Sequence, residues 1–208
     1  LTIATAIASV LADIHDCGVI HRDVKPSNII VEQGRSGVQV VDFGLATRLA
    51  QETQRPTSPD ALEGTLAYLS PEQTGRMNRA IDRRADLYSF GVTLYQMLTG
   101  VLPFVSDDPL ELVHSHIART PVSPRVHAPE LPELVAAVVM KLLAKAPEDR
   151  YQSARGLAAD LDACLAQLAG AAPLQPFALG QHEQAPTLRA PQRVYGREKE
   201  VAALLAAF

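Results

Sequence analysis

Residues 21–28 read HRDVKPSN, and this stretch determines how the rest of the chain is interpreted. Short β-branched runs flank it at residues 19–20 and 29–31, which predicts a polar loop between two short strands. Two further polar clusters follow in the sequence. They are Asp42-Phe43-Gly44, directly after the β-branched run 38–41, and Gly64-Thr65 with Ser70-Pro71-Glu72, at the far end of a polar loop expected over residues 47–65.

The first two clusters contain side chains suited to phosphoryl transfer. This reaction requires positioning and charge neutralisation more than covalent chemistry by the protein. A carboxylate accepts the proton of the attacking hydroxyl, a cation stabilises the transferred group, and oxygen ligands hold Mg²⁺ across the nucleotide phosphates. Those groups are present as Asp23, Lys25, Asn28 and Asp42. Singly, each acid has an ordinary explanation as a solvated loop residue, but the combination favours a catalytic site.

These clusters resemble the catalytic loop, the metal-binding Asp-Phe-Gly segment and the end of the activation segment of protein kinases. The resemblance implies that Asp23 is the catalytic base and that Asn28 and Asp42 bind Mg²⁺. It also implies that Lys25 approaches the transferred phosphate of ATP, as in the serine/threonine branch of the family. The expected cofactors are therefore ATP and Mg²⁺, and the expected substrate is a protein Ser or Thr hydroxyl, including that of the enzyme itself.

The resemblance assigns supporting roles to further residues. Glu72 is expected to pair with Arg150, and Asp86 is expected to brace the catalytic loop from the start of a buried helix. Thr65 matches the segment that contacts the acceptor residue. Arg22 is in a position that often receives an activation-loop phosphate in the family. The remaining matched positions are expected to shape the loops: His21, Phe43 and Gly44.

Hydrophobic periodicity predicts a mainly α fold with short β elements, an α+β class. Helices are expected over residues 1–16, 86–98, 132–145 and 153–168, with another that begins at the capping residue Asp108. The resemblance to protein kinases covers residues 1–168 and implies that they form a protein-kinase-like C-terminal lobe. These 208 residues contain no glycine-rich loop, so the chain is expected to lack the nucleotide-binding N-lobe. The chain alone is therefore expected to be inactive, although its parent protein is expected to be a kinase.

The C-terminal part differs in composition from the rest. Residues 169–193 contain four prolines without any period, which predicts a linker. Residues 194–208 begin VYGREKE and resemble the start of an AAA-type ATPase domain. Together with residues 63–79, this segment is similar to large bacterial multi-sensor kinases. The resemblance implies a cytoplasmic signalling protein with an ATPase-like domain downstream in the same chain.

Composition excludes several classes of partner. The 208 residues include 19 basic and 23 acidic side chains, a net charge of −4, with no basic footprint for nucleic acid. The two cysteines are too few for a disulfide framework, which favours a reducing cytosolic setting. No apolar run is long enough to predict a membrane span.

Three functions stay open at this level. The chain is part of an active serine/threonine kinase, a catalytically silent kinase-like regulatory module, or a scaffold for the ATPase-like domain. Regulation by phosphorylation of Thr47, Thr53, Thr57 or Ser58 is as compatible with the sequence as simple loop polarity. His114 and His116 do not predict a metal site, because residues two apart on a helix face different directions.

Overall fold

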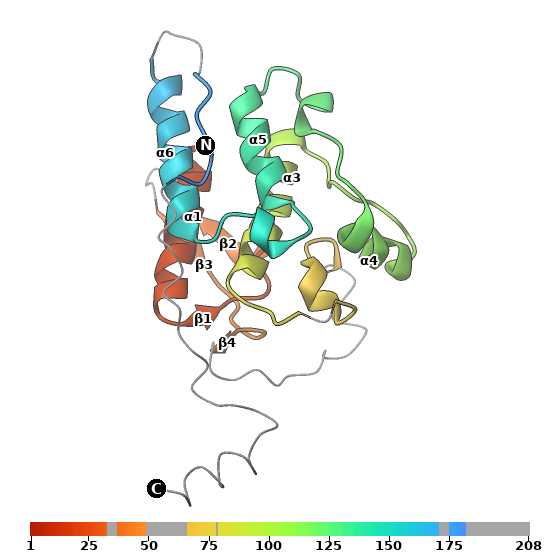
Figure 1. Ribbon diagram of the computed structural model, residues 1–208. Helices are drawn as coiled ribbons and strands as arrows, with labels where there is room; N and C mark the ends of the chain where they lie inside the picture. Colours follow the sequence, from red (N-terminus) through yellow and green to blue (C-terminus); the bar gives the residue numbers. More distant parts are fainter. Residues whose placement is uncertain (33–36, 49–65, 78, 171–174, 182–208) are drawn as a thin grey trace, which may run out of the picture.

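The computed structural model describes residues 1–32, 37–48, 66–77, 79–170 and 175–181. This part of the chain is mostly helical with a few short strands, so the predicted α+β class is confirmed (Figure 1). Its α-helices are α1 (Thr2–Asp16), α3 (Arg84–Thr99), α4 (Pro109–Ala118), α5 (Glu133–Leu142) and α6 (Ala154–Leu168). Its strands are β1 (Val19–Ile20), β2 (Ile29–Val31), β3 (Val38–Val40) and β4 (Thr47–Arg48).

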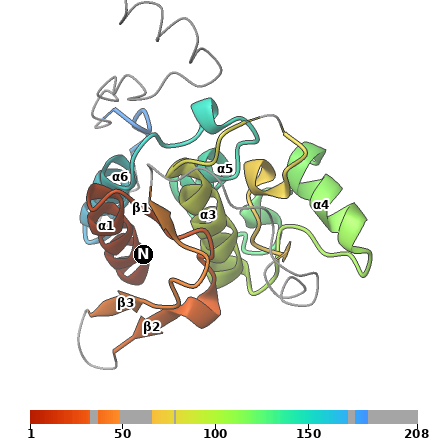
Figure 2. The same ribbon diagram turned by 90° about the horizontal axis from the view of Figure 1, so that it is seen from below.

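Helix α3 is the centre of the fold. Every residue from Ala85 to Tyr95 is buried, as its nearly continuous apolar sequence predicts. Viewed from below, α3 lies between the α1–α6 pair on one side and α4 on the other (Figure 2). A side chain at Gly91 would place its Cβ 2.7 Å from the Cβ of Leu142, so glycine permits the close packing of α3 against α5.

Helices α1 and α6 pack side by side although they are far apart in sequence (Figures 1 and 2). Small and branched apolar residues of α1, among them Ile7 and Leu11, join Leu157 and Leu161 of α6 in one buried core. Gly18 ends the α1 region with a φ of 73°, in the left-handed conformation that glycine adopts without strain. The chain then forms the short strand β1 and continues into the polar stretch of residues 21–28.

Two short antiparallel ladders hold the loops of the site, β2–β3 and, below it in Figure 1, β1–β4. Strands β2 and β3 pair in antiparallel orientation, with Ile29 opposite Val40 and Val31 opposite Val38. Strand β1 pairs with β4, so that Ile20 lies opposite Thr47. The expectation that Thr47 begins an irregular loop was wrong, because its backbone completes a ladder that a local sequence pattern does not reveal.

Helix boundaries agree with the sequence with small corrections. The predicted helix 86–98 begins two residues earlier, and the predicted helix 132–145 ends at Leu142, before a 3₁₀ turn at Pro147–Asp149. Asp108 caps α4 as expected, accepting a hydrogen bond of 2.9 Å from the backbone N–H of Leu110. Within the described ranges, no helix is long and apolar enough to span a membrane.

The predicted linker and second domain stay predictions. Residues 194–208 and most of 169–193 lie outside the described residues, as do Thr53, Thr57, Ser58 and Thr65. Residues 175–181, within the predicted linker, contact α6: the backbone N–H of Gly180 donates a 2.7 Å hydrogen bond to the carboxylate of Asp160. Leu179 also packs against the core.

Candidate active site

The polar stretch after β1 brings three of the predicted site residues into direct contact. The Oδ2 atom of Asp23 lies 2.8 Å from the ammonium nitrogen of Lys25 and accepts a 2.9 Å hydrogen bond from the side-chain amide of Asn28. The same amide donates to the backbone carbonyl of Asp23 at 2.9 Å. Asp23 and Asn28 are both buried, so this geometry is held by the protein interior.

The other carboxylate oxygen of Asp23 has a different environment. Oδ1 is buried, and the described part of the chain supplies no hydrogen-bond partner for it. A buried carboxylate oxygen is costly to leave unsatisfied. One oxygen of Asp23 is thus anchored by Lys25 and Asn28, while the other remains available to accept a hydrogen bond from a bound hydroxyl.

Asp42 lies at the exposed edge of the same region. The backbone N–H of the preceding Val41 donates to the carbonyl of Asn28 at 2.9 Å, and the carbonyl of Val41 accepts from Nε2 of His21 at 3.1 Å. The carboxylate of Asp42 accepts a long 3.3 Å hydrogen bond from Gly44 N–H. Phe43 is 47% exposed, with its ring centroid 4.7 Å from that of His21.

Two backbone conformations in this site are unusual for their residue types. Arg22 and Asp42 adopt φ values of 68° and 66°, the positive-φ non-glycine residues of the described chain. Such conformations cost of order 1–3 kcal/mol each and persist only where surrounding contacts impose them. The strained residues are therefore Arg22, which precedes Asp23, and Asp42 itself. At both places the direction of the backbone determines where the carboxylate lies.

Asp86 imposes the conformation of the loop around Arg22. From the first turn of α3, its fully buried carboxylate accepts the backbone N–H groups of His21 at 2.8 Å and of Arg22 at 2.7 Å. The ring of His15 donates a third hydrogen bond at 2.8 Å. This charged acceptor anchors the loop from within the core, in the place that the sequence suggested for it.

A second anchor comes from the 3₁₀ turn Pro71–Thr74. The side-chain amide of Gln73 donates to the carbonyl of Arg22 at 2.8 Å, and its oxygen accepts from the backbone and hydroxyl of Ser70. The sequence analysis did not identify Gln73. Its position three residues after a serine is, however, a capping signature that a closer search would have found.

Glu72 and Arg150 form a fully buried ion pair. The two guanidinium nitrogens donate to the two carboxylate oxygens at 2.7 and 2.9 Å, and both side chains are at most 1% exposed. The remaining guanidinium hydrogens go to backbone carbonyls, which belong to Arg84, Ala144 and Lys145. The pair connects the 3₁₀ turn Pro71–Thr74 to the turn Pro147–Asp149 between α5 and α6.

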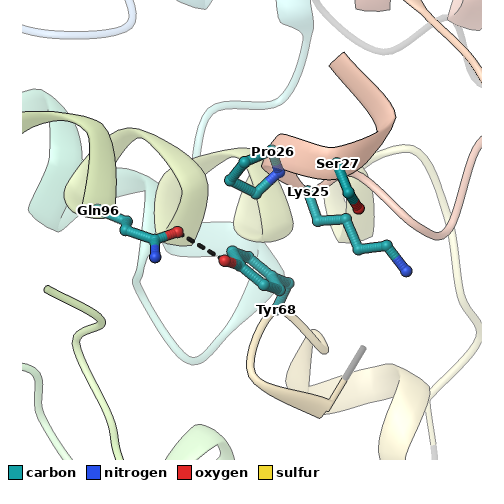
Figure 3. Close-up of a pocket in the computed structure, with 5 residues that line it drawn as sticks. All are labelled: Lys25, Pro26, Ser27, Tyr68 and Gln96. Atoms are coloured by element: carbon teal, nitrogen blue, oxygen red, sulfur yellow. Dashed lines mark hydrogen bonds between the residues drawn. The ribbon is translucent and has the colours of Figure 1, made fainter. Parts of the chain in front are cut away.

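A pocket of about 400 Å³ opens beside Lys25 (Figure 3). Its lining comes from the residues after Asp23, from the segment before the 3₁₀ turn, and from α3. The hydroxyl of Tyr68 donates a 2.6 Å hydrogen bond to the side-chain oxygen of Gln96 across this pocket. The lining residues are Lys25, Pro26, Ser27, Tyr68 and Gln96. No local sequence signal indicated Tyr68 or Gln96, because they meet only in the folded chain.

The residues present fit a nucleotide-bound Mg²⁺ better than a metal held by protein alone. No group of three or more His, Cys, Asp or Glu side chains capable of holding a metal occurs among the described residues. Mg²⁺ needs only one or two protein oxygens when phosphates supply the others. The exposed carboxylate of Asp42 and the side-chain oxygen of Asn28, from two segments joined through Val41, are donors of that kind.

Comparison with known proteins identifies the family. The sequence-family model of the protein kinase domain matches residues 2–160, so this chain belongs to the protein kinase family. It is 44% identical over 178 residues to the serine/threonine-protein kinase PknB of Mycolicibacterium smegmatis, covering 85% of this chain and 27% of that protein.

Two other relatives have comparable sequence identities to this chain. PknB of Mycobacterium tuberculosis H37Rv is 43% identical over 147 residues, covering 71% of this chain and 23% of that protein. A probable serine/threonine-protein kinase of Streptomyces coelicolor is 39% identical over 165 residues, covering 79% and 24% respectively. The chain thus spans about a quarter of the length of the curated relatives it matches.

Proposed function

We propose that this chain is the C-terminal lobe of a serine/threonine protein kinase that transfers the γ-phosphate of ATP to protein hydroxyl groups. The observation that carries the proposal is the asymmetry of Asp23. Its Oδ2 is fixed by Lys25 and Asn28, and its Oδ1 is buried without a partner among the described residues. A base that must receive a substrate proton requires one oriented and unoccupied oxygen of this kind.

The other side chains complete the acceptor half of a phosphoryl-transfer site. Bound Mg²⁺ would neutralise charge on the nucleotide phosphates, and Asn28 and Asp42 are the residues that would hold it. Lys25 reaches Asp23 at 2.8 Å and is thus next to the position of the attacking hydroxyl, where a cation stabilises the transferred group. Asp86 acts indirectly, by fixing the backbone on which Asp23 is carried.

The proposal extends to the organisation of the parent protein. The described chain carries the candidate catalytic residues on a mainly helical fold, and the glycine-rich loop and its lysine, which cover ATP in a kinase, would come from an N-lobe elsewhere in the parent protein. We also propose that residues 194–208 begin an ATPase-like domain, from their resemblance to such domains. The protein would work in the cytoplasm, where ATP and protein substrates, itself included, are available.

Phosphate transfer by the full-length protein tests this function. The assay uses labelled Mg²⁺-ATP and general protein substrates, and it compares Asp23→Asn and Asp42→Asn with the exposed helix α6 variant Asp162→Asn. We expect acid-stable label on Ser or Thr in the native protein and in Asp162→Asn. Loss of the base or of a metal ligand should lower the rate by at least about 10²-fold.

Two other outcomes of this assay would overturn the proposal or part of it. If the native protein is folded and binds nucleotide but transfers no phosphate, even with its downstream domains present, the kinase proposal is wrong. The chain is then a catalytically silent regulatory or scaffold module. If transfer occurs but Asp23→Asn retains it, the assignment of the base is wrong while the activity stands.

A further inference from the structure

Residues 175–181 pack on the helical lobe as a strap, although composition predicts a linker there. The backbone N–H of Gln175 donates to the side-chain oxygen of Gln167 at 2.6 Å, near the end of α6. Further along the strap, the N–H of Gly180 donates to Asp160, about two helical turns nearer the start of α6. The strap therefore runs back along α6, where it is the dark blue segment beside the helix in Figure 1.

We infer that this strap positions the catalytic loop, and that the part of the protein downstream of residue 181 regulates phosphate transfer by docking or releasing it. The docked strap shields Asp160 from water and fixes the turn that carries Arg150. Release of the strap loosens that turn and, through it, the loop that carries the proposed base. This inference rests on the proposed kinase function.

Asp160 connects the strap to the interior of the lobe. The residue is 1% exposed, and its Oδ2 accepts hydrogen bonds from the N–H of Gly180 at 2.7 Å and from the hydroxyl of Tyr151 at 2.8 Å. Its Oδ1 is buried and has no hydrogen-bond partner in the described part of the chain. A buried carboxylate depends on the donors that it has, so withdrawal of the strap removes a large part of its stabilisation.

The strap also keeps water away from this carboxylate. Gly180 is half-buried, whereas Asp160 beneath it is fully buried, and Leu179 packs against the hydrophobic core. Gly180 has a φ of 81°, a left-handed conformation that glycine adopts without strain and that directs its N–H to the carboxylate. If the strap left, water would reach Oδ2 and compete with the hydroxyl of Tyr151 for it.

A continuous set of contacts leads from Tyr151 to the catalytic loop. Tyr151 follows Arg150 in the chain, and Arg150 forms the buried ion pair with Glu72. The next residue after Glu72 is Gln73, whose amide donates to the carbonyl of Arg22 at 2.8 Å. Arg22 directly precedes the proposed base. Contiguous packed contacts of this kind can carry coupling where one element has two states, and the docked and released strap is that element.

The strap is held weakly enough to be released. Four of its seven residues are exposed and none is fully buried. Segments with few buried contacts open at a small fraction of the free energy of global unfolding. Release of the strap is therefore compatible with an intact lobe, as a regulatory contact requires.

Two variants of the full-length protein release the strap by different chemistry. Leu179→Asp places a charge where an apolar side chain packs against the core. Gly180→Pro removes the donor N–H and excludes the positive φ. Ala178→Asp adds the same charge at an exposed residue of the strap and causes neither loss, so it is the matched control.

Hydrogen exchange and phosphate transfer from Mg²⁺-ATP to a general protein substrate are measured at a temperature where circular dichroism shows every variant to be folded. We expect Leu179→Asp and Gly180→Pro to raise deuterium uptake in residues 175–181, 71–74 and 21–23, and to leave residues 120–131, which lie off this route, unchanged. The same two variants should lower kcat by at least about fivefold, the low end of typical couplings between sites. Ala178→Asp should match the native protein in both measurements.

Several outcomes would overturn the inference while the kinase function stands. They are rapid exchange of residues 175–181 in the native protein, uptake there that neither release variant raises, and a released strap with unchanged kcat. Unfolding of the whole lobe in both release variants also overturns it, because the strap would then be an ordinary part of the core. Absence of transfer by the native protein overturns the proposed function, and the catalytic role of the strap with it.

Discussion

Two arginine–glutamate pairs join the same two segments of this molecule. Arg150 pairs with Glu72, and Arg79 pairs with Glu148, so each pair links the residues 72–79 to the residues 148–150. Their N···O distances are nearly equal, at 2.7 and 2.6 Å. The first pair is at most 1% exposed, whereas Arg79 and Glu148 are 41% and 58% exposed. Burial is the main difference between them, and Arg150 also donates to three backbone carbonyls.

The comparison shows which polar contacts the fold depends on. A buried charge that loses its partner cannot be solvated, so its loss carries the full desolvation cost. An exposed charge that loses its partner is solvated by water, and salt screens what attraction there was. The same contrast separates the buried polar groups around α3, such as Asp86 and His116, from the ion pairs on the surface.

The largest expected effect is that of Arg150→Ala. It leaves the carboxylate of Glu72 buried and removes the donor to three backbone carbonyls. Breaking a buried pair from one side costs about 3–5 kcal/mol, so we expect a loss of that size in the free energy of unfolding. Urea denaturation of the full-length protein measures it. An unchanged midpoint with an unchanged slope would show that burial does not make this pair important.

Sequence reasoning anticipated this buried pair and the central helix, because both leave local signals. The continuous apolar run 86–98 predicts burial on all sides, and Glu72 and Arg150 occupy family positions. It did not anticipate contacts that depend on tertiary structure alone. His15 reaches Asp86 across 71 residues, and neither residue's local pattern indicates the other.

The candidate site shows the same division. The sequence identified Asp23, Lys25 and Asn28 because they lie close together in one short polar stretch, and the structure brings their side chains into contact. The pocket formed with Tyr68 and Gln96 was not predictable, since these residues are 28 positions apart and have no shared period. Residues that line a site from separate elements become visible only once the chain is folded.

A somewhat smaller effect on the free energy of unfolding is expected from His116, a buried residue of α4. Its contribution to stability depends on pH. Burial lowers the pKa of His116 to about 4, assisted by the cation of Lys145, while the carbonyls of Leu66 and Ala67 act in the opposite direction. Its Nδ1 faces the Tyr88 hydroxyl at 3.0 Å.

Between pH 6.5 and 4 the unfolded chain binds a proton at His116 that the folded chain does not, so stability falls as the pH falls through this range. The contribution lost from this one group is about 3 kcal/mol. It is fully present above pH 6.5.

Unfolding free energies at pH 7, 6, 5 and 4 measure this contribution as the difference between the native protein and His116→Gln, which cannot titrate. The native protein should lose more stability than the variant over this interval. Parallel pH profiles would contradict the prediction. His127→Gln, at an exposed histidine, controls for the general effect of removing an imidazole.

The smallest expected effect is that of Arg79→Ala, and it is the sharpest test of the comparison. It removes a pair with short distances to both carboxylate oxygens, yet both side chains are exposed and water replaces the contact. We expect a urea midpoint close to that of the native protein, with any difference disappearing at high salt.

Arg150→Ala is the matched comparison, because both variants remove an arginine that links the same two segments. If Arg79→Ala destabilised the protein as much as Arg150→Ala, burial would not explain the difference in importance between the two ion pairs.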